Sequence, residues 1–346
     1  MFEKAKHPGK MEGPTKYYCT LFNSAYLSRG LVLIETLRIH AADFHLYVLA
    51  LDQRVCEVLR GLALDELTVI PLESFEDSEL LKAKSNRTIG EYCWTCTSSL
   101  ILYCITKFQI SHCTYLDADL YFYSDPAILV DEIGVDDVLL TEHRYSRQYD
   151  QSATSGIFCV QFLTFRNTLN SLRVLQWWRS ACLEWCYARM ENGKFGDQKY
   201  LDQWPRMFDG IHVMKNLGGG LAPWNIQQYE IPAFERVLRW KGARIAPVFF
   251  HFHNLKIYQN GYWKAEGEYL LTSKVRRYFY APYAKHLFRV ERSLKVTLAR
   301  ASVYRSREIL SEYLLSVAKG AMNMIRLILG KGISDLLAIN RKYHKI

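Results

Sequence analysis

The order of apolar segments in the first third of the chain restricts its possible folds more than any other feature. Short apolar runs of strand length alternate with longer segments whose apolar residues recur at helical spacing. Because consecutive parallel strands need a crossover helix, this alternation predicts an α/β fold with a mostly parallel sheet flanked by helices. Strands are expected at 17–22, 45–51 and 67–72, and helices at 27–37 and 54–62.

The same alternation continues through the middle of the chain. A helix expected at 91–107 leads into a strand-like run that begins near Ile110. In doubly wound sheets, ligands bind at the carboxyl ends of the strands, so polar residues that follow such runs are candidate site residues. Further strands are expected at 137–141 and 157–165, and a long helix at 169–190.

Two carboxylates one residue apart follow the strand that begins near Ile110. Asp117 and Asp119 flank Ala118, and the sequence is apolar on both sides of them. A hard divalent cation that also bridges a diphosphate commonly takes one or two protein carboxylates. A solvated turn between two strands is the alternative, because Asp is common in turns. The apolar flanks favour a metal site, since two charges are costly in apolar surroundings.

Three later clusters carry polar or imidazole side chains. They are Asp197 with Gln198, the segment 218–225, and the aromatic segment that contains His251 and His253. The triple glycine that opens 218–225 lacks the spacing of a phosphate-binding fingerprint. His251 and His253 are expected on one face of a strand, where either completes a metal site or both form a hydrogen-bonded pair under a sheet.

Composition places the chain among globular proteins. It has 346 residues, of which 49% are hydrophobic, and no apolar run long enough to span a bilayer. The N-terminus lacks the apolar core of a secretion signal, so a cytoplasmic location is expected. The nine cysteines are odd in number and mostly lie in apolar runs, which indicates reduced core residues. Cys93 and Cys96 have the spacing of a redox or zinc motif, but no second pair accompanies them.

The positive charge of the chain is concentrated in its tail. Residues 271–346 contain sixteen Lys or Arg and four acidic residues, a net charge of +12 against +9 for the whole chain, so the remainder carries −3. Apolar residues alternate with basic ones at 278–298 and 306–337, as in helices that dock on anionic membranes. A helical cap packed on the enzyme, with a solvated basic face, is the alternative. The expected organisation is a flexible lead-in at 1–15, a main domain at 16–266 and a basic helical extension at 267–346.

The ordered clusters resemble metal-dependent nucleotide-sugar glycosyltransferases of the GT-A fold, in particular the family-8-like bacterial enzymes that build cell-surface glycans. The resemblance runs in order across about residues 17–260. It is carried by the following segments: Asn23 to Tyr26, Arg87, Asp117-Ala118-Asp119, 156–165, Asp197-Gln198, Pro223-Trp224-Asn225 and 251–256.

The resemblance implies roles for individual residues. Asp117, Asp119 and His251, with His253 as the alternative, would be ligands of Mn²⁺ or Mg²⁺. Asp197 and Gln198 would line the sugar pocket at the reacting carbon and act in catalysis. The implied donor-binding residues are Thr20, Asn23, Arg87, Asp117, Trp224, Asn225 and Lys256, the last of them neutralising the donor diphosphate.

The implied function is transfer of a sugar from a nucleotide diphosphate donor, such as a UDP-sugar, to a cell-surface glycan or a lipid-linked acceptor, with retention of configuration. The family's His-x-x-Gly-x-x-Lys pattern has Asn254 at the glycine, and Lys256 lies one residue nearer the histidine. Thr154 replaces the asparagine of the family's Asn-x-Gly turn. A catalytically weak or inactive nucleotide-sugar-binding module is therefore an alternative. A nucleic-acid-binding protein is a less favoured one, because the basic charge lies in one tail and not along an aromatic groove.

Overall fold

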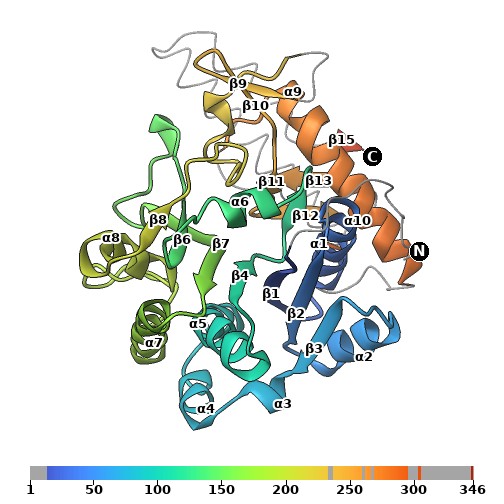
Figure 1. Cartoon of the computed structure of the whole chain (residues 1–346). Coiled ribbons are helices and arrows are strands. Elements are labelled where there is room, and N and C mark those ends of the chain that lie inside the picture. Colours follow the sequence, from blue (N-terminus) through green and yellow to red (C-terminus); the bar gives the residue numbers. More distant parts are fainter. Residues whose placement is uncertain are drawn as a thin grey trace, which may run out of the picture. The chain divides into compact units, whose positions relative to one another are not determined.

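The computed structural model describes residues 14–232, 237–258, 262–265, 269–294, 303–304 and 344–345 (Figure 1). Contacts within the chain divide it into two units, Met1–His251 and Phe252–Ile346. Each unit is described by itself. The predicted domain limits at residues 15 and 266 remain predictions.

A seven-stranded sheet forms the centre of the first unit, and its strands lie in the order β3-β2-β1-β4-β7-β6-β8. The pairs β1–β2, β2–β3, β1–β4 and β6–β8 are parallel, whereas β7 runs antiparallel to β4 and β6. The predicted α/β class with a mostly parallel sheet is therefore confirmed. The strands are β1 (Lys16–Phe22), β2 (Phe44–Ala50), β3 (Leu67–Pro71), β4 (His112–Leu116), β6 (Val138–Glu142), β7 (Phe158–Arg166) and β8 (Ile211–Val213).

Four of the eight helices described in the first unit begin at a residue whose side chain accepts backbone N–H groups. Asp52, Asp77 and Thr168 do so for α2, α4 and α7, and Thr88 forms a reciprocal capping box with Glu91 at α5. The helices are α1 (Leu27–His40), α2 (Gln53–Gly61), α3 (Leu72–Phe75), α4 (Ser78–Lys84), α5 (Ile89–Phe108), α6 (Ala127–Asp131), α7 (Leu169–Glu184) and α8 (Trp204–Met207), with 3-10 turns η1 (Arg147–Tyr149), η2 (Gln198–Gln203) and η3 (Ile226–Gln228).

The helix predicted at 169–190 ends early. Helix α7 stops at Glu184, and Trp185 takes an extended backbone conformation. The chain then follows other contacts, because the Ala188 N–H donates to the Glu91 carboxylate at the start of α5. Tertiary contacts therefore override the helical pattern, although Trp185 is still buried.

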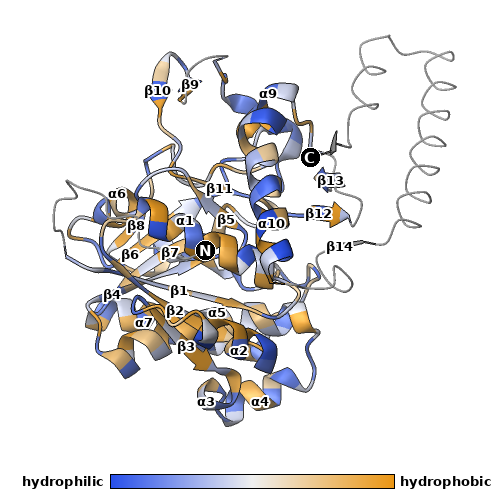
Figure 2. Cartoon of the chain, turned by 90° about the vertical axis from the view of Figure 1, so that its right-hand side faces the viewer, coloured by the Kyte–Doolittle hydropathy of each residue, from blue (hydrophilic) through white to orange (hydrophobic). Residues whose placement is uncertain are grey.

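The main core lies between the sheet and the pair α5 and α7, which pack against each other (Figure 2). Alternate residues of β1 face opposite sides of the sheet: Cys19 and Leu21 join this core, while Phe22 packs against Gly30 of α1. All nine cysteines are free thiols, as expected for reduced core residues, and all except Cys93 are buried. The Sγ atoms of Cys19, Cys104 and Cys113 lie within 4.8 Å of one another.

Two small antiparallel pairs complete the described strands of the first unit. In one pair, β5 (Leu120–Phe122) runs alongside β11 (Phe249–His251), and in the other β9 (Leu238–Trp240) runs alongside β10 (Ala243–Ile245). The β5–β11 pair matters for function, because it brings residues more than one hundred positions apart in the sequence next to each other.

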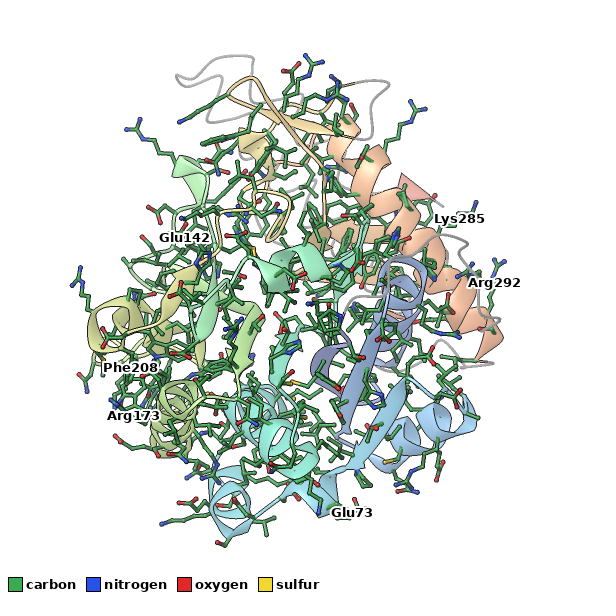
Figure 3. The ribbon with its side chains drawn as sticks, in the orientation of Figure 1. Glu73, Glu142, Arg173, Phe208, Lys285 and Arg292 are labelled. Atoms are coloured by element: carbon green, nitrogen blue, oxygen red, sulfur yellow. The ribbon has the colours of Figure 1, made fainter. Side chains whose placement is uncertain are left out.

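The second unit contains short strands and a helical segment with a basic face. On α10, Lys285, Arg289 and Arg292 are exposed, whereas Leu287 and Val290 are buried (Figure 3). The amphipathic segment predicted at 306–337 lies outside the described residues. Within the described part of the chain, no helix is both long and apolar enough to cross a membrane. The elements are β12 (Leu255–Tyr258), β13 (Tyr262–Ala265), β14 (Val303–Tyr304), β15 (His344–Lys345), α9 (Ser273–Val275), η4 (Arg276–Tyr280) and α10 (Ala281–Ser293).

Candidate metal and donor site

Asp117 and Asp119 lie in the tight turn that joins β4 to β5. The Asp117 N–H donates to the Gln161 carbonyl of β7, and the Leu120 N–H donates to the Asp117 carbonyl, which closes the turn. Strand pairing therefore fixes the backbone on both sides of the two carboxylates. Asp119 is only 7% exposed, so the turn is not the solvated loop that the sequence left open as an alternative.

His251, the last residue of the first unit and of β11, lies next to Asp117 and Asp119. It pairs with Leu120 across the β5–β11 ladder, and its N–H donates to the Leu221 carbonyl. Its Nε2 atom lies 3.1 Å from Asp119 Oδ1 and 3.6 Å from Asp117 Oδ2. One ligand atom from each of the three residues lies within 4.8 Å of the other two. The structure thus brings together all three predicted metal ligands.

The three side chains perturb one another's protonation. Burial disfavours the charged imidazole, but the charges of Asp119 and Asp117 and the hydrogen bonds to Asp119 and Cys159 together outweigh it and raise the pKa of His251 well above its usual value. Burial, and more weakly Asp119, raises the pKa of Asp117 to about 6, against the opposing effect of His251. Without a metal, a proton on His251 supplies the positive charge between the carboxylates.

The donor set suits a divalent cation. The site offers two carboxylate oxygens and one imidazole nitrogen. These match a cation that accepts both ligand types, and Mn²⁺ does so more readily than Mg²⁺. The Trp224 ring packs edge-on against the His251 ring, with 5.3 Å between ring centroids, and limits its rotation. The residues present therefore fit the predicted cation.

Asp197 is a third buried carboxyl group near the cluster. It is 5% exposed, and its backbone carbonyl accepts from the Trp178 indole N–H at 2.9 Å. Burial and the nearby Asp117 charge raise the pKa of Asp197 to about 8, so it is mostly protonated at neutral pH. Gln198 is the first residue of η2, and its side-chain amide donates to the Ser155 carbonyl at 2.7 Å. These contacts join Asp197-Gln198 to the turn at 151–157.

That turn depends on Gly156, which has a φ of +104°. An added Cβ there would approach the Asp202 carboxylate, which accepts from the Ile157 N–H at 2.7 Å. The Thr154 hydroxyl donates to the Gln151 carbonyl. The glycine of the predicted turn is thus needed by its geometry, and Thr154 stabilises the turn locally.

Trp224 and Asn225 are both tied to the His143 carbonyl. It accepts from the Trp224 indole N–H at 2.9 Å and from the Asn225 amide at 2.8 Å. The Asn225 amide also donates to the Gly220 carbonyl, and its oxygen accepts from the Ala222 N–H. Asn225 therefore shapes the loop that supports His251. Donor contact by Trp224 and Asn225 remains a prediction.

The other predicted donor-binding residues of the first unit lie on different elements and have different contacts. Thr20 of β1 is fully buried, and its hydroxyl has no hydrogen-bond partner among the described residues. Asn23 follows β1 and accepts from the Ala25 N–H at 3.0 Å. Arg87 stacks on Tyr187, 3.8 Å from the ring centre, and donates to the last carbonyls of α7. Their contact with a donor remains a prediction.

The strand expected to carry both histidines ends at His251. His253 and Asn254 form a turn instead, closed by the Leu255 N–H donating to the Phe252 carbonyl, so the expected shared face is wrong. Asn254 has a φ of +56°, a conformation that asparagine tolerates almost as well as glycine. His253 and Lys256 belong to the second unit, and their roles remain predictions.

Sequence reasoning missed three neighbours of the cluster. Tyr26 is a neighbour of Asp119. Burial and then the Asp119 charge are the main causes that raise the pKa of Tyr26 to about 12. The Arg29 guanidinium lies over the Tyr26 ring at 4.8 Å. Cys159 of β7 adjoins His251. Burial raises the pKa of the Cys159 thiol, and His251 partly offsets this effect. Tyr26 could have been inferred from its place just after β1, at the carboxyl edge of the sheet.

No protein-family model matches the chain. Several solved structures of glycosyltransferases align with it at low identity and with TM-scores below 0.5. Mouse xyloside xylosyltransferase 1 aligns over 69% of this chain and 98% of its own, with 12% identity and a TM-score of 0.44. GlyE of Streptococcus pneumoniae aligns over 82% of this chain and 64% of its own, with 14% identity and a TM-score of 0.46. The function proposed below therefore rests on the geometry of the site.

Two curated relatives come from Bacillus subtilis strain 168, and both are uncharacterized. YfnF is 28% identical over 257 residues, which cover 70% of this chain and 82% of YfnF. YfnD is 36% identical over 224 residues, which cover 63% of this chain and 71% of YfnD. This chain belongs to the protein family of YfnD.

Proposed function

We propose that this protein is a metal-dependent glycosyltransferase of the GT-A type that uses a nucleotide diphosphate sugar. One observation carries the proposal: an Asp-x-Asp turn at the carboxyl edge of the sheet meets His251, with ligand atoms from all three residues within 4.8 Å. In doubly wound sheets this edge is where nucleotide ligands bind.

Asp117, Asp119 and His251 would hold the cation. When bound, Mn²⁺ or Mg²⁺ would stabilise the negative charge that develops on a departing diphosphate. The chain's own contribution is to fix these ligands through the β5–β11 ladder and to shield His251 with the Trp224 ring. Both features hold the ligands in place before a donor arrives.

Asp197 and Gln198 are proposed to face the transferred sugar. A carboxyl group with a pKa of about 8 carries a proton at neutral pH and can donate a hydrogen bond to a sugar hydroxyl or a leaving oxygen. Gln198 orients the turn that includes Thr154 through its bond to Ser155. Thr20, Asn23, Arg87 and Lys256 are proposed donor contacts.

The finer assignments are also proposals. We infer a UDP-sugar as donor, a cell-surface glycan or lipid-linked sugar as acceptor, and retention of anomeric configuration, from the motifs that resemble family-8-like enzymes. A location on the cytoplasmic face of the membrane would bring the basic extension close to such an acceptor. NMR of the first product formed would determine its anomeric configuration.

The proposal is tested by thermal unfolding of the full chain with a panel of nucleotide sugars, each with and without Mn²⁺. A bound donor must raise the melting temperature by mass action, and the rise should require the metal. UDP-sugars are expected to produce it. An absence of metal-dependent stabilisation by any nucleotide sugar would refute the proposal.

Hydrolysis of the stabilising donor distinguishes an enzyme from an inactive binding module. Slow release of free sugar in the presence of Mn²⁺ is expected from a transferase that lacks its acceptor. Stabilisation without any hydrolysis or transfer would favour the binding module instead.

A further inference from the structure

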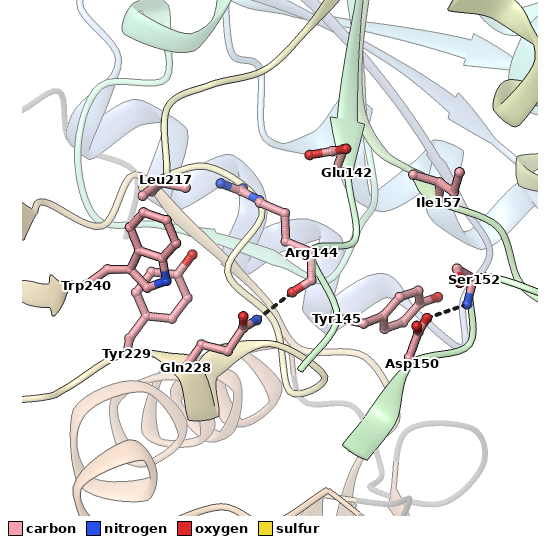
Figure 4. Close-up of a pocket in the computed structure, with 10 residues that line it drawn as sticks. All are labelled: Glu142, Arg144, Tyr145, Asp150, Ser152, Ile157, Leu217, Gln228, Tyr229 and Trp240. Carbon is pink, nitrogen blue, oxygen red and sulfur yellow. Dashed lines mark hydrogen bonds between the residues drawn. The ribbon is translucent and has the colours of Figure 1, made fainter. Parts of the chain in front are cut away.

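A polar cavity lies in the first unit, outside the metal cluster. Its volume is about 500 Å³, within the range of small-molecule sites of roughly 300–1,000 Å³. It lies at the carboxyl end of β6 and is lined by residues of the segment 142–157, by Leu217, and by Gln228, Tyr229 and Trp240. Figure 4 shows Tyr229 and Trp240 on one side, Tyr145 and Asp150 on the other, and Glu142 between them.

The lining combines aromatic rings with planar hydrogen-bonding groups. Tyr145, Tyr229 and Trp240 provide apolar faces, and Glu142 and Asp150 provide carboxylates. Sugars offer the complementary surface, because their C–H groups pack on aromatic rings while adjacent hydroxyls bind the two oxygens of one carboxylate. This mixture is unlike an apolar pocket built for an acyl chain.

Charge argues against a nucleotide in this cavity. Among the described residues, its lining has two carboxylates and a single cation, Arg144, and the Arg144 guanidinium already donates to the carbonyls of Asn216 and Gly219. A diphosphate here would face Glu142 and Asp150 without a free cation in the lining to neutralise it. The cavity therefore favours a neutral, hydroxyl-rich ligand over a phosphorylated or acidic one.

A continuous series of ring contacts joins the cavity to the metal cluster. Tyr145 stacks on His143 with 4.6 Å between ring centroids and an interplanar angle of 11°. His143 contacts Trp224 at 5.2 Å, and Trp224 contacts His251 at 5.3 Å. A ligand against Tyr145 is thus three ring contacts from a proposed metal ligand, which places it beside the proposed donor site.

We propose that this cavity binds the acceptor and that the acceptor end is a neutral saccharide, held by the rings of Tyr229 and Trp240 and by the carboxylates of Glu142 and Asp150. The assignment rests on the proposed glycosyltransferase function, since it names the acceptor class of the same site. Nothing in it depends on the identity of the donor.

The test measures saccharide binding without donor or metal. Saturation-transfer NMR on the full chain uses neutral pentoses, hexoses, N-acetylhexosamines and their short oligosaccharides, with glucuronic acid and UDP as charged probes. At least one neutral saccharide should bind. Trp240→Ala, Glu142→Gln and Asp150→Asn should each weaken it by about tenfold, because each removes one ring or carboxylate contact from a small ligand.

Glu73→Gln is the matched control, because Glu73 lies on α3, away from Glu142 in Figure 3, and should leave binding unchanged. The two carboxylate variants preserve side-chain size, so they test the cavity even if Trp240→Ala disturbs the β9–β10 hairpin. Equal binding by all variants, preference for the charged probes, or no saccharide binding would overturn the assignment.

Donor binding is measured separately by metal-dependent thermal stabilisation. Stabilisation by a nucleotide sugar without saccharide binding would leave the proposed function standing and reject the acceptor cavity. Saccharide binding that the Glu142 and Asp150 variants weaken, without any donor stabilisation, would support the cavity and reject the transferase.

Discussion

The Asp119 carboxylate and the His251 imidazole lie 3.1 Å apart, and a cation bound here would replace the proton between them. His251 has a raised pKa because of Asp119, and Asp117 has one of about 6 because of burial. At the scale of residues, the two carboxylates therefore favour a proton on His251. Metal binding must release it.

Manganese affinity should consequently depend on pH. The protons on His251 and Asp117 compete with the cation, so affinity should rise from pH 5.5 to 8, by about tenfold per pH unit for each proton displaced. Isothermal titration calorimetry in two buffers with different ionisation enthalpies measures both the affinity and the protons released. Flat affinity and no proton release across this interval would contradict the assignment of His251 as a ligand.

The variant Asp119→Asn should lose manganese-dependent thermal stabilisation. Removal of a direct ligand should cost more than the ~10–100-fold in affinity that loss of an outer partner costs. An amide can still accept a hydrogen bond from His251, so the far-UV circular dichroism spectrum should keep its native form. Asp209→Asn, an exposed position between α8 and β8, is the control. Normal stabilisation of the Asp119 variant would exclude this residue as a ligand.

The metal cluster shows which site residues can be predicted from residue types and their order in the sequence. Asp117, Asp119 and His251 were predictable because carboxylates at strand ends and a distant histidine fit one chemistry. Cys159 was not recognised as a site neighbour, because a cysteine within a strand is common in any core. The pairing of β5 with β11 and of β4 with β7 identifies it as one, whereas Tyr26 follows β1 at the sheet edge where site residues are expected.

At the scale of elements, close approach of α1 to β1 depends on a missing side chain. A Cβ on Gly30 would lie 2.3 Å from the nearest atom of the Phe22 ring. Gly30→Ala should therefore lower the free energy of unfolding by about 1–3 kcal/mol through overpacking. Urea denaturation measures it.

Gly90→Ala is the matched control for that helix substitution. Gly90 lies in the first turn of α5, and nothing is within 4 Å of an added Cβ. Alanine there should leave stability unchanged or raise it by up to about 1 kcal/mol. A second substitution, Phe22→Leu, should recover part of the loss in Gly30→Ala; no loss in Gly30→Ala itself would show that α1 can shift away from the sheet.

Most of the strands and helices that the sequence predicted lie within one or two residues of the observed bounds, since their apolar periodicity matches the element that forms. Short elements such as α3, α4, α6, α8 and β8 were not predicted. The exceptions occur where a tertiary contact competes. Helix α7 ends at Glu184 because the following segment binds the start of α5, and β11 ends at His251 because the chain turns at Asn254. Apolar periodicity predicts which residues are buried, but it does not predict at which residue a helix or strand ends.

At the scale of the whole molecule, the basic residues remain concentrated toward the C-terminus. Residues 295–346 alone contain ten Lys or Arg and three acidic residues, and the exposed face of α10 adds Lys285, Arg289 and Arg292. Juxtamembrane basic residues each contribute roughly 1 kcal/mol to binding at an anionic surface. Composition predicted this asymmetry, but it cannot separate membrane docking from a solvated helical cap.

Vesicle flotation separates those two alternatives. The full chain should float with phosphatidylglycerol-containing vesicles, while a chain ending at Leu294 should float much less. Pure phosphatidylcholine vesicles should recover neither, and added salt should weaken the interaction because surface charges are screened. Equal recovery of both chains would assign the extension to the solvated cap.

The β5–β11 ladder also affects the entropy change when the proposed cation binds. Both strands are already hydrogen-bonded, and the His251 amide is bonded to Leu221 without any ion. The ligands are thus preorganised, so little conformational entropy remains to be lost when the ion enters. Such a site would change its occupancy while its backbone stays still, and amide hydrogen exchange at His251 would report opening of its bond to the Leu221 carbonyl rather than arrival of the metal.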